Sequence, residues 1–491
     1  FIIFRVKNQR KKLKKRKFIY IPAESSIPMM ISILPLYLGI IKAGYDIKVY
    51  INLREIKNAI FYFFLGINNF YFFSGKSLFK RKSNIDLKDF DINQSIEATL
   101  MRHFKLESIE KLESSHKLNL INSCKNILNS FSSQNFSEIY GILFTDHIYL
   151  PQDLMKKYIE KYYPRINIFD YHIGHQNSTL IINHLSKKNK LRHPFSPPQN
   201  IFKDYIDSIS YDQSKLLVEK IQINLKSLYE KSLWYDSCNT SGYIKNQLTT
   251  KEQLFKSSCT DEHVFAIFPH IYFDTPAFKG TDLYKNYRDW FESTIIFILE
   301  NTDSKIIIKD HPANLSKYAL DNEEFRSPVK FFLNHLDFKY DKRFLYLAPS
   351  TNISALNIIQ IADCILTVRG TIGLEASLLG KPVIFAGSGR FDGYGFGSFP
   401  ENIKDYQELL IKFCQNKDLI SFEEKLKAAT YLDLLWNKMT HYSKIIFIEY
   451  PKNKKEKMIS NVNTLNLKKI DHEIKPISKW IQKPNECYTS S

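Results

Sequence analysis

The stretch CILTVRGTIGLEASLLGKPVIFAG, residues 364–387, joins two apolar runs through a glycine turn and a short helical segment. Its apolar ends are typical of buried strands, and Gly370 and Gly380 stand where the chain enters and leaves the helix. This order of strand, turn, helix and strand is the βαβ unit of an α/β protein. Backbone N–H groups at the start of such a helix can hold an anion, so the stretch predicts a phosphate pocket.

The same alternation continues upstream. Apolar strands at 263–270, 305–312 and 344–349 alternate with helical segments. The first half of the chain opens with a strand at 17–26, a single helix at 29–44 and a strand at 46–51. Short strands that alternate with helices predict parallel sheets with right-handed crossovers. We therefore expect an α/β fold in which two Rossmann-like doubly wound domains face a central cleft.

The length of 491 residues exceeds what one hydrophobic core usually supports. We expect an N-terminal Rossmann-like domain over 1–255, a C-terminal Rossmann-like domain over 256–450 and a basic C-terminal tail over 451–491. A segment rich in serine and threonine, 239–262, is the expected linker between the two domains.

The formal charge of +18 indicates anionic partners, which include nucleotides, phospholipid surfaces, acidic glycans and nucleic acids. An RNA-binding protein is one alternative, but the sequence shows no recognised RNA-binding module with aromatic residues interleaved among basic ones. We therefore expect no nucleic-acid partner. A steep salt dependence of RNA affinity would favour that alternative.

The six cysteines are scattered and form no C-x-x-C pair, which favours a reducing cytoplasm. No secretory signal is recognisable, and whether residues precede Phe1 stays open. The apolar stretch 27–41 is shorter than a spanning helix and contains two prolines, while 59–75 has two asparagines in its middle. Both are expected to be core or interface rather than membrane spans.

Polar residues follow the predicted strands of the second half. His270 and Asp274 follow one strand, Lys309 and His311 end the next, and Arg369, Gly370, Thr371, Gly373, Glu375 and Arg390 follow the last two. Because ligands of doubly wound sheets bind at the carboxyl ends of the strands, these residues are expected to line one donor-binding crevice.

The spacing of these residues suggests a role for several of them. His311 lies between a strand and Pro312, so its imidazole is held at the rim, where it can donate to a leaving phosphate or transfer a proton. Thr371 is expected to cap the helix, and Glu375, one turn later, can accept hydrogen bonds from ribose hydroxyls. An ordinary capped helix with a surface glutamate is the alternative interpretation.

If the chain transfers a group to an acceptor hydroxyl, a general base must take the proton of that hydroxyl, and we expect this base from the first domain. The candidates are Glu24, Asp146, His147, His172 and His175, of which Asp146 is the preferred base. No metal signature appears, since the chain lacks H-E-x-x-H, clustered Cys and His, and a D-x-D at a strand end. We expect no metal and no cofactor, because helix dipoles and cations can stabilise a departing phosphate.

Three segments in this order, IFPHIYFDTPAFKGTDLYKNYRDWF, IKDHPAN and TVRGTIGLEASLLGKPVIFAGSGRFDGYGFG, resemble bacterial capsule and surface-polysaccharide biosynthesis proteins. The resemblance is to the Kdo-transferase-like type with the GT-B glycosyltransferase fold, and it covers mainly 264–400. It implies an enzyme that transfers a sugar from a nucleotide-sugar donor to a glycan or glycolipid acceptor, and the donor could be a CMP-sugar that carries a Kdo-like sugar. We expect this enzyme in the cytoplasm, docked on the inner membrane.

The resemblance also implies roles for individual residues. His311 would contact the donor phosphate, Thr371 matches the phosphate-binding serine or threonine of CMP-sugar transferases, and Glu375 matches their ribose-binding glutamate. The acidic motif that those enzymes have in the first domain finds no secure match here.

Two related enzyme classes and one non-enzymatic role compete with this interpretation. CDP-alditol phosphotransferases of the teichoic-acid type share the H-P element, although the turn here is RGTIG rather than serine-rich. UDP-GlcNAc 2-epimerases share the fold but have a C-terminal signature that this chain lacks. A degenerate scaffold at a membrane assembly would be marked by loss of nucleotide binding.

Overall fold

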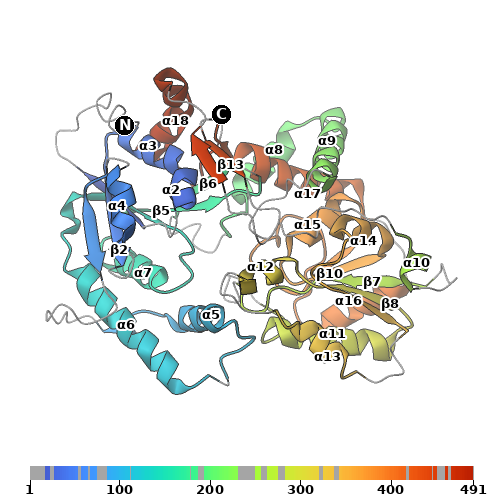
Figure 1. Ribbon diagram of the computed structural model, residues 1–491. Coiled ribbons are helices and arrows are strands. Elements are labelled where there is room, and N and C mark those ends of the chain that lie inside the picture. Colours follow the sequence, from blue (N-terminus) through green and yellow to red (C-terminus); the bar gives the residue numbers. More distant parts are fainter. Residues whose placement is uncertain are drawn as a thin grey trace.

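The computed structural model describes residues 17–489 except for 23–26, 53–56, 65–66, 74–85, 111, 177, 186–192, 231–248, 256–261, 275–281, 320–324, 337–341, 416–419, 445, 450–458 and 463–465. Two α/β units lie side by side, each built on its own sheet (Figure 1). Glu24, most of the expected linker 239–262 and the basic run 452–457 of the tail lie outside the described residues.

The first sheet has seven strands in the order β12-β6-β5-β4-β1-β2-β3. Neighbours among β1 to β5 are parallel, whereas β6 is antiparallel to β5, and β12 to β6. The strands are β1 (Phe18–Pro22), β2 (Asp46–Asn52), β3 (Phe70–Phe73), β4 (Ile139–Phe144), β5 (Asn167–Ile173), β6 (Thr179–His184) and β12 (Thr440–Tyr442).

Alternate residues of these strands enter cores on opposite faces of the sheet. Ile19 and Ile21 of β1 pack with helices α3 (Leu34–Lys42) and α18 (Leu467–Gln482), while Tyr20 packs toward the other face. That other face is covered by α5 (Asn93–Phe104), α6 (Ser114–Ser132) and α7 (Gln152–Tyr162). Helices α2 (Ile27–Ser32) and α4 (Lys57–Phe64) and the hairpin of β13 (Ile446–Glu449) and β14 (Ile459–Val462) complete this unit.

The single helix predicted at 29–44 is wrong in one respect, because the structure has two helices, α2 and α3, that meet at Ile33. Pro35 stands in the first turn of α3, where the missing N–H is tolerated, and the chain begins a new helix there. Among the helices that the structure describes, none combines the length and hydropathy needed to cross a lipid bilayer.

The second sheet has five parallel strands in the order β11-β10-β7-β8-β9. They are β7 (Val264–Ile267), β8 (Lys305–Lys309), β9 (Phe344–Leu347), β10 (Cys364–Thr367) and β11 (Val383–Phe385). One face packs on α9 (Tyr211–Glu230), α14 (Ala355–Ile361), α15 (Thr371–Leu378) and α17 (Phe422–Asp433); the other packs on α11 (Tyr287–Asn301), α13 (Pro328–Leu333) and α16 (Ile403–Gln415). Shorter helices are α8 (Gln199–Ser208), α10 (Lys251–Phe255) and α12 (Ala313–Ala319). The predicted α/β fold with two Rossmann-like domains is confirmed.

The packing crosses the expected domain boundaries. Helix α9 belongs to the range 1–255 in sequence but packs against α15 and α17 on the second sheet. Helix α18 belongs to the expected tail 451–491 but lies against α3 on the first sheet, and Figure 1 shows it beside the N-terminal helices. The chain therefore passes between the units near residue 195 and again near residue 440.

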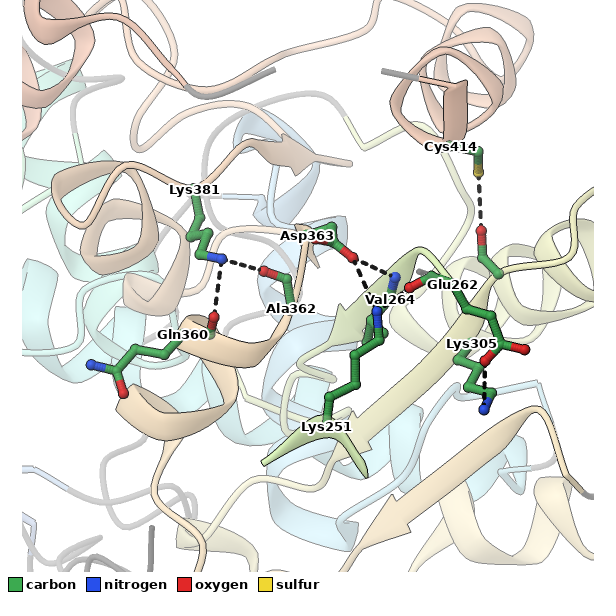
Figure 2. Close-up of polar contacts among 10 residues, drawn as sticks. Lys251, Glu262, Val264, Lys305, Gln360, Ala362, Asp363, Lys381 and Cys414 are labelled. Atoms are coloured by element: carbon green, nitrogen blue, oxygen red, sulfur yellow. Dashed lines mark hydrogen bonds and ion pairs between the residues drawn. The ribbon is translucent and has the colours of Figure 1, made fainter. Parts of the chain in front are cut away.

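At the amino edge of the second sheet, positive side chains have protein partners (Figure 2). Lys305 Nζ lies 2.5 Å from Glu262 Oε2, and Lys251 Nζ lies 3.9 Å from Asp363 Oδ2. Lys381 Nζ donates to the carbonyl oxygens of Gln360 and Ala362 at 3.0 and 2.7 Å. The lysines of this edge thus bind carboxylates and carbonyl oxygens of the protein itself.

Candidate functional site

Strands β7, β8, β10 and β11 end at the opposite edge of the same sheet, and the predicted donor residues follow them. His270, after β7, accepts a hydrogen bond at Nε2 from the backbone N–H of Arg369, at 3.1 Å. Its ring stacks on Tyr287 with centroids 4.7 Å apart. Burial, and then the positive charges of His311, Arg369 and Arg390, lower the pKa of His270 to about 3. This imidazole is therefore neutral at pH 7.

His311 follows β8, as predicted, and its ring orientation is fixed by the backbone. Its Nδ1 accepts a hydrogen bond from the N–H of Ala313 at 3.1 Å, so in the neutral ring the proton is on Nε2. The adjacent Asp310 is buried and accepts hydrogen bonds from the N–H of His311, Asn314 and Tyr346 at 2.8 to 3.0 Å. Asp310 thus holds the turn that presents the histidine as a donor.

Lys309 is the last residue of β8 and is 6% exposed. Among the residues that the structure describes, its Nζ has no hydrogen-bond partner. Burial lowers its pKa to about 8, and the nearby Asp310 opposes that shift. A buried ammonium without a partner has a high desolvation cost, which an anionic ligand would offset.

The two arginines of the crevice differ in what they contact. The Arg369 guanidinium lies 2.6 Å from Asp282 and donates through Nε to the carbonyl of Ser388, so it ties together the loops at the ends of β10 and β11. Arg390 donates to the carbonyl of Arg369 at 3.3 Å and lies over the ring of Phe391. Asp282 offsets the charge of Arg369, and the charge of Arg390 acts on the buried Glu375.

Helix α15 begins without a side-chain cap. The expectation that Thr371 caps it is wrong: Gly370 is the N-cap residue, Thr371 is already inside the helix, and no side chain accepts from the first turn. The first N–H groups of this helix therefore lack a side-chain acceptor. Gly373 is required for packing, because a Cβ there would come within 2.4 Å of the Phe385 ring.

Glu375 is buried on α15 at 2% exposure and accepts a hydrogen bond from Tyr229 of α9. Burial raises its pKa to about 8, which the Tyr229 hydrogen bond and the charge of Arg390 only partly oppose. Its predicted contact with a ribose stays a prediction, and such a contact would have to share the carboxyl group with Tyr229.

The first domain brings three histidines to the crevice. The rings of His172, His175 and His193 surround Phe195, with centroid distances of 5.3, 5.0 and 5.6 Å. Burial, and then the charge of Arg390, lower the pKa of His175 to about 3. Burial also lowers that of His193, with Arg390, His172 and Arg369 adding to the effect. The rings of His175 and His193 are therefore neutral near pH 7, and the charge that acts on them comes from Arg390 of the second domain.

The preferred base, Asp146, lies after β4 as expected, in the left-handed region with φ 47°. Its carboxylate is 3.3 Å from Arg102 and 52% exposed, and its role as the base stays a prediction. Asp274 follows β7 and its negative charge acts on both His270 and Arg102. The rest of its loop, 275–281, lies outside the described residues.

A pocket lies where the two domains meet beside His270. It is lined by Lys105 and Glu107 from the first domain and by second-domain residues that include His270, Tyr272, Asp310 and Asn314. The described residues contain no group of three or more His, Cys, Asp or Glu side chains placed to hold a metal ion.

Sequence reasoning missed His193, Phe195, Tyr229 and Asp282. His193, Phe195 and Tyr229 do not follow a strand of the second sheet, and Asp282 lies far beyond the end of β7, so the rule that found the other residues could not reach them. The one available signal was that His193 and Phe195 flank Pro194 in a segment of mixed polar and aromatic residues.

Residues 185–408, which include the second sheet and the Phe195 segment, match the family model described as "Capsule polysaccharide biosynthesis protein". The predicted relationship to capsule polysaccharide biosynthesis proteins is confirmed. The matched region contains the predicted donor-site residues from His270 to Arg390, whereas Asp146 lies outside it.

Solved structures similar to this chain include two of KpsC from Thermosulfurimonas dismutans. The "beta Kdo 2,7 transferase" is 13% identical, with 94% of this chain and 99% of that one covered and a TM-score of 0.37. The "beta Kdo 2,4 transferase" is 12% identical, with 60% and 80% covered and a TM-score of 0.33. The UDP-GlcNAc 2-epimerase of Methanocaldococcus jannaschii is 14% identical, with 85% and 98% covered and a TM-score of 0.30. No curated protein matches the chain.

Proposed function

We propose that this chain is a glycosyltransferase of surface-polysaccharide assembly that uses a nucleotide-sugar donor, in the first instance a CMP-sugar of the Kdo type. The observation that carries the proposal is the positive crevice at the carboxyl edge of the second sheet. There Lys309 is buried without a hydrogen-bond partner among the described residues, the charge of Arg390 acts on His270, and α15 begins without a side-chain cap. The match to the capsule family supports the assignment.

In the proposed reaction the donor phosphate binds between His311, Arg390 and the start of α15. His311, with Nε2 protonated, donates to the phosphate as negative charge develops on the leaving nucleotide. Lys309 adds charge from beneath the crevice. These groups need no metal to stabilise the leaving group, so we propose that a chelator leaves transfer unchanged.

The acceptor enters from the first domain in this proposal. We propose a glycan or glycolipid acceptor and a peripheral contact with the cytoplasmic face of the inner membrane. Helix α4 supports that contact, because Ile60 and Phe63 are 57% and 62% exposed. Loss of co-sedimentation with anionic vesicles in an Ile60→Asp, Phe63→Asp double variant would support it, and unchanged co-sedimentation would contradict it.

The test of the donor site is calorimetric titration with CMP, CDP, UDP and GDP, each repeated on His311→Ala. Selective binding of CMP that depends on His311 supports the proposal. Selective binding of CDP would favour an alditol phosphotransferase, and UDP or GDP a hexose donor or an epimerase. A wild-type chain that binds none of the four nucleotides would contradict the donor site.

A further inference from the structure

A carboxylate in the first domain lies between two histidines. Asp170 of β5 is 1% exposed, and its Oδ2 lies 3.4 Å from His172 Nε2 and 3.5 Å from His147 Nδ1. Burial alone would raise the pKa of Asp170, but its interaction with His172, the charge of His147 and a hydrogen bond from Asn183 lower it below its ordinary value. Asp170 is therefore an ionised carboxylate fixed beneath the sheet edge.

Of the three side chains, His172 is the one that reaches the crevice. Its side chain is 12% exposed, against 2% for His147 and 1% for Asp170. Its ring packs against Phe195, and its charge acts on His193 together with those of Arg369 and Arg390. His172 therefore lies near the carboxyl end of β5, beside the Phe195 segment that contacts the second domain through Tyr431.

We propose that His172 is the general base that deprotonates the acceptor hydroxyl, and that Asp170 is the positioning residue that orients its ring. This inference rests on the proposed glycosyltransferase function. It replaces Asp146 as the base, because the Asp146 carboxylate is paired with Arg102, whereas the His172 ring is backed by a buried carboxylate. A base oriented by a third, buried group is an arrangement that recurs in enzymes that activate a hydroxyl.

In this proposal the Nε2 proton of His172 is directed at Asp170, 3.4 Å away, which leaves the lone pair on Nδ1. In the step, Nδ1 takes the proton of the acceptor hydroxyl while that oxygen bonds to the anomeric carbon of the donor sugar. The bond from this carbon to the phosphate oxygen breaks, and its electron pair leaves with the nucleotide. The imidazolium that forms is stabilised by Asp170 and returns its proton to solvent.

The other histidines do not fit this role. His147 contacts the same carboxylate but is buried away from the crevice. His175 has a pKa lowered to about 3 by burial and Arg390, and the pKa of His193 is also lowered well below its ordinary value. Both would be weak proton acceptors near neutral pH.

The test compares His172→Asn with the matched control His147→Asn, which removes the other histidine on the same carboxylate. Turnover is release of nucleotide from a panel of CMP-, UDP- and GDP-sugars with a membrane lipid extract as acceptor. We expect His172→Asn to lose about 10²–10³-fold in kcat, the usual contribution of a general base, and to bind nucleotide within about twofold of wild type. The control should lose less than about tenfold. A His172→Asn kcat within about threefold of wild type would overturn the proposal.

A second measurement does not depend on turnover. The ¹⁵N shifts of the His172 ring report which nitrogen carries the proton. We expect Nε2–H in the wild type and a change toward Nδ1–H in Asp170→Asn, whose amide can donate to Nε2. An unchanged tautomer overturns the positioning role of Asp170. Absence of nucleotide binding in the wild type would instead contradict the proposed function, so the two failures are distinguishable.

Discussion

The two ends of strand β8 carry lysines in opposite situations. Lys305, at the amino end, lies 2.5 Å from Glu262, whereas Lys309, at the carboxyl end, has no hydrogen-bond partner among the described residues. Both lysines are largely buried and both belong to β8, so neither burial nor the choice of strand explains the difference. What differs is the edge of the sheet at which each side chain lies.

The amino edge uses its charges to hold elements together, and the carboxyl edge holds charge that the protein itself does not fully neutralise. Arg369 has a carboxylate partner in Asp282, and Arg390 donates to a carbonyl, lies over a ring and acts on Glu375. Lys309 Nζ is the crevice cation without a hydrogen-bond partner among the described residues. A folded chain can retain the desolvation cost of a buried, unpaired charge at a site where a ligand of opposite charge offsets that cost. The difference between the edges is therefore the physical argument for an anion site.

The largest effect is expected when each of the two lysines of β8 is replaced by methionine in turn. Lys309→Met should weaken nucleotide binding about 30-fold, or about 2 kcal/mol, because a charge-assisted contact is lost. Its free energy of unfolding should stay the same or rise, since a buried unpaired charge is removed. Lys305→Met is the matched control: affinity should be unchanged and unfolding should become about 1 kcal/mol easier. Calorimetry measures the affinities and urea denaturation measures the free energies of unfolding. Equal affinity losses in the two variants would contradict an anion site that is confined to the carboxyl edge.

A second prediction concerns the pH dependence of stability. The pKa of Glu375 is raised to about 8 by burial, so the folded state binds its proton more tightly than the unfolded state does. Its contribution is fully present below the unfolded pKa of about 4.5 and is lost as the pH rises through about 8. As the pH rises from about 5 to about 6.5, the free energy of unfolding of Glu375→Gln should therefore rise by roughly 2 kcal/mol relative to that of the wild type. Parallel stability curves for the two proteins would contradict the burial of an acid here.

Packing beneath the crevice gives a third prediction. Gly373→Ala places a methyl group within 2.4 Å of the Phe385 ring and so pushes α15 away from the sheet. We expect the free energy of unfolding to fall by about 1.5 kcal/mol, as in other overpacked cores. Denaturant unfolding measures this change. An unchanged midpoint for Gly373→Ala would show that α15 can shift freely.

The smallest effect is expected at the amino edge. Lys381→Met removes two hydrogen bonds to the last carbonyls of the α14 segment, at Gln360 and Ala362. Unfolding should become about 1 kcal/mol easier, while nucleotide affinity should not change. A loss of affinity in this variant would mean that the two edges are not separate.

Local sequence patterns predicted the strand ends of the second sheet well. His270, Lys309, His311 and Arg369 all lie at its carboxyl edge, because alternating βα units leave few other topologies. The break between α2 and α3 could have been read from Pro35, where the helix restarts.

The pairings that give the site its character could not be read from the sequence. Tyr229 meets Glu375 from 146 residues away, and Asp282 meets Arg369 from 87 residues away. The segment with Phe195 joins the two domains through Tyr431, and α18 returns to the first sheet after the whole second sheet has formed. Such contacts depend on packing between distant segments, which periodicity and turn signals do not encode.

The most direct test of the anion site is a crystal structure of the chain with bound CMP. We predict phosphate density at the carboxyl edge of β8 and β10, above the first turn of α15. This phosphate should lie within hydrogen-bond distance of His311 Nε2 and Arg390. Density for the nucleotide at the amino edge or on the far face of either sheet, with the crevice occupied by water alone, would contradict it.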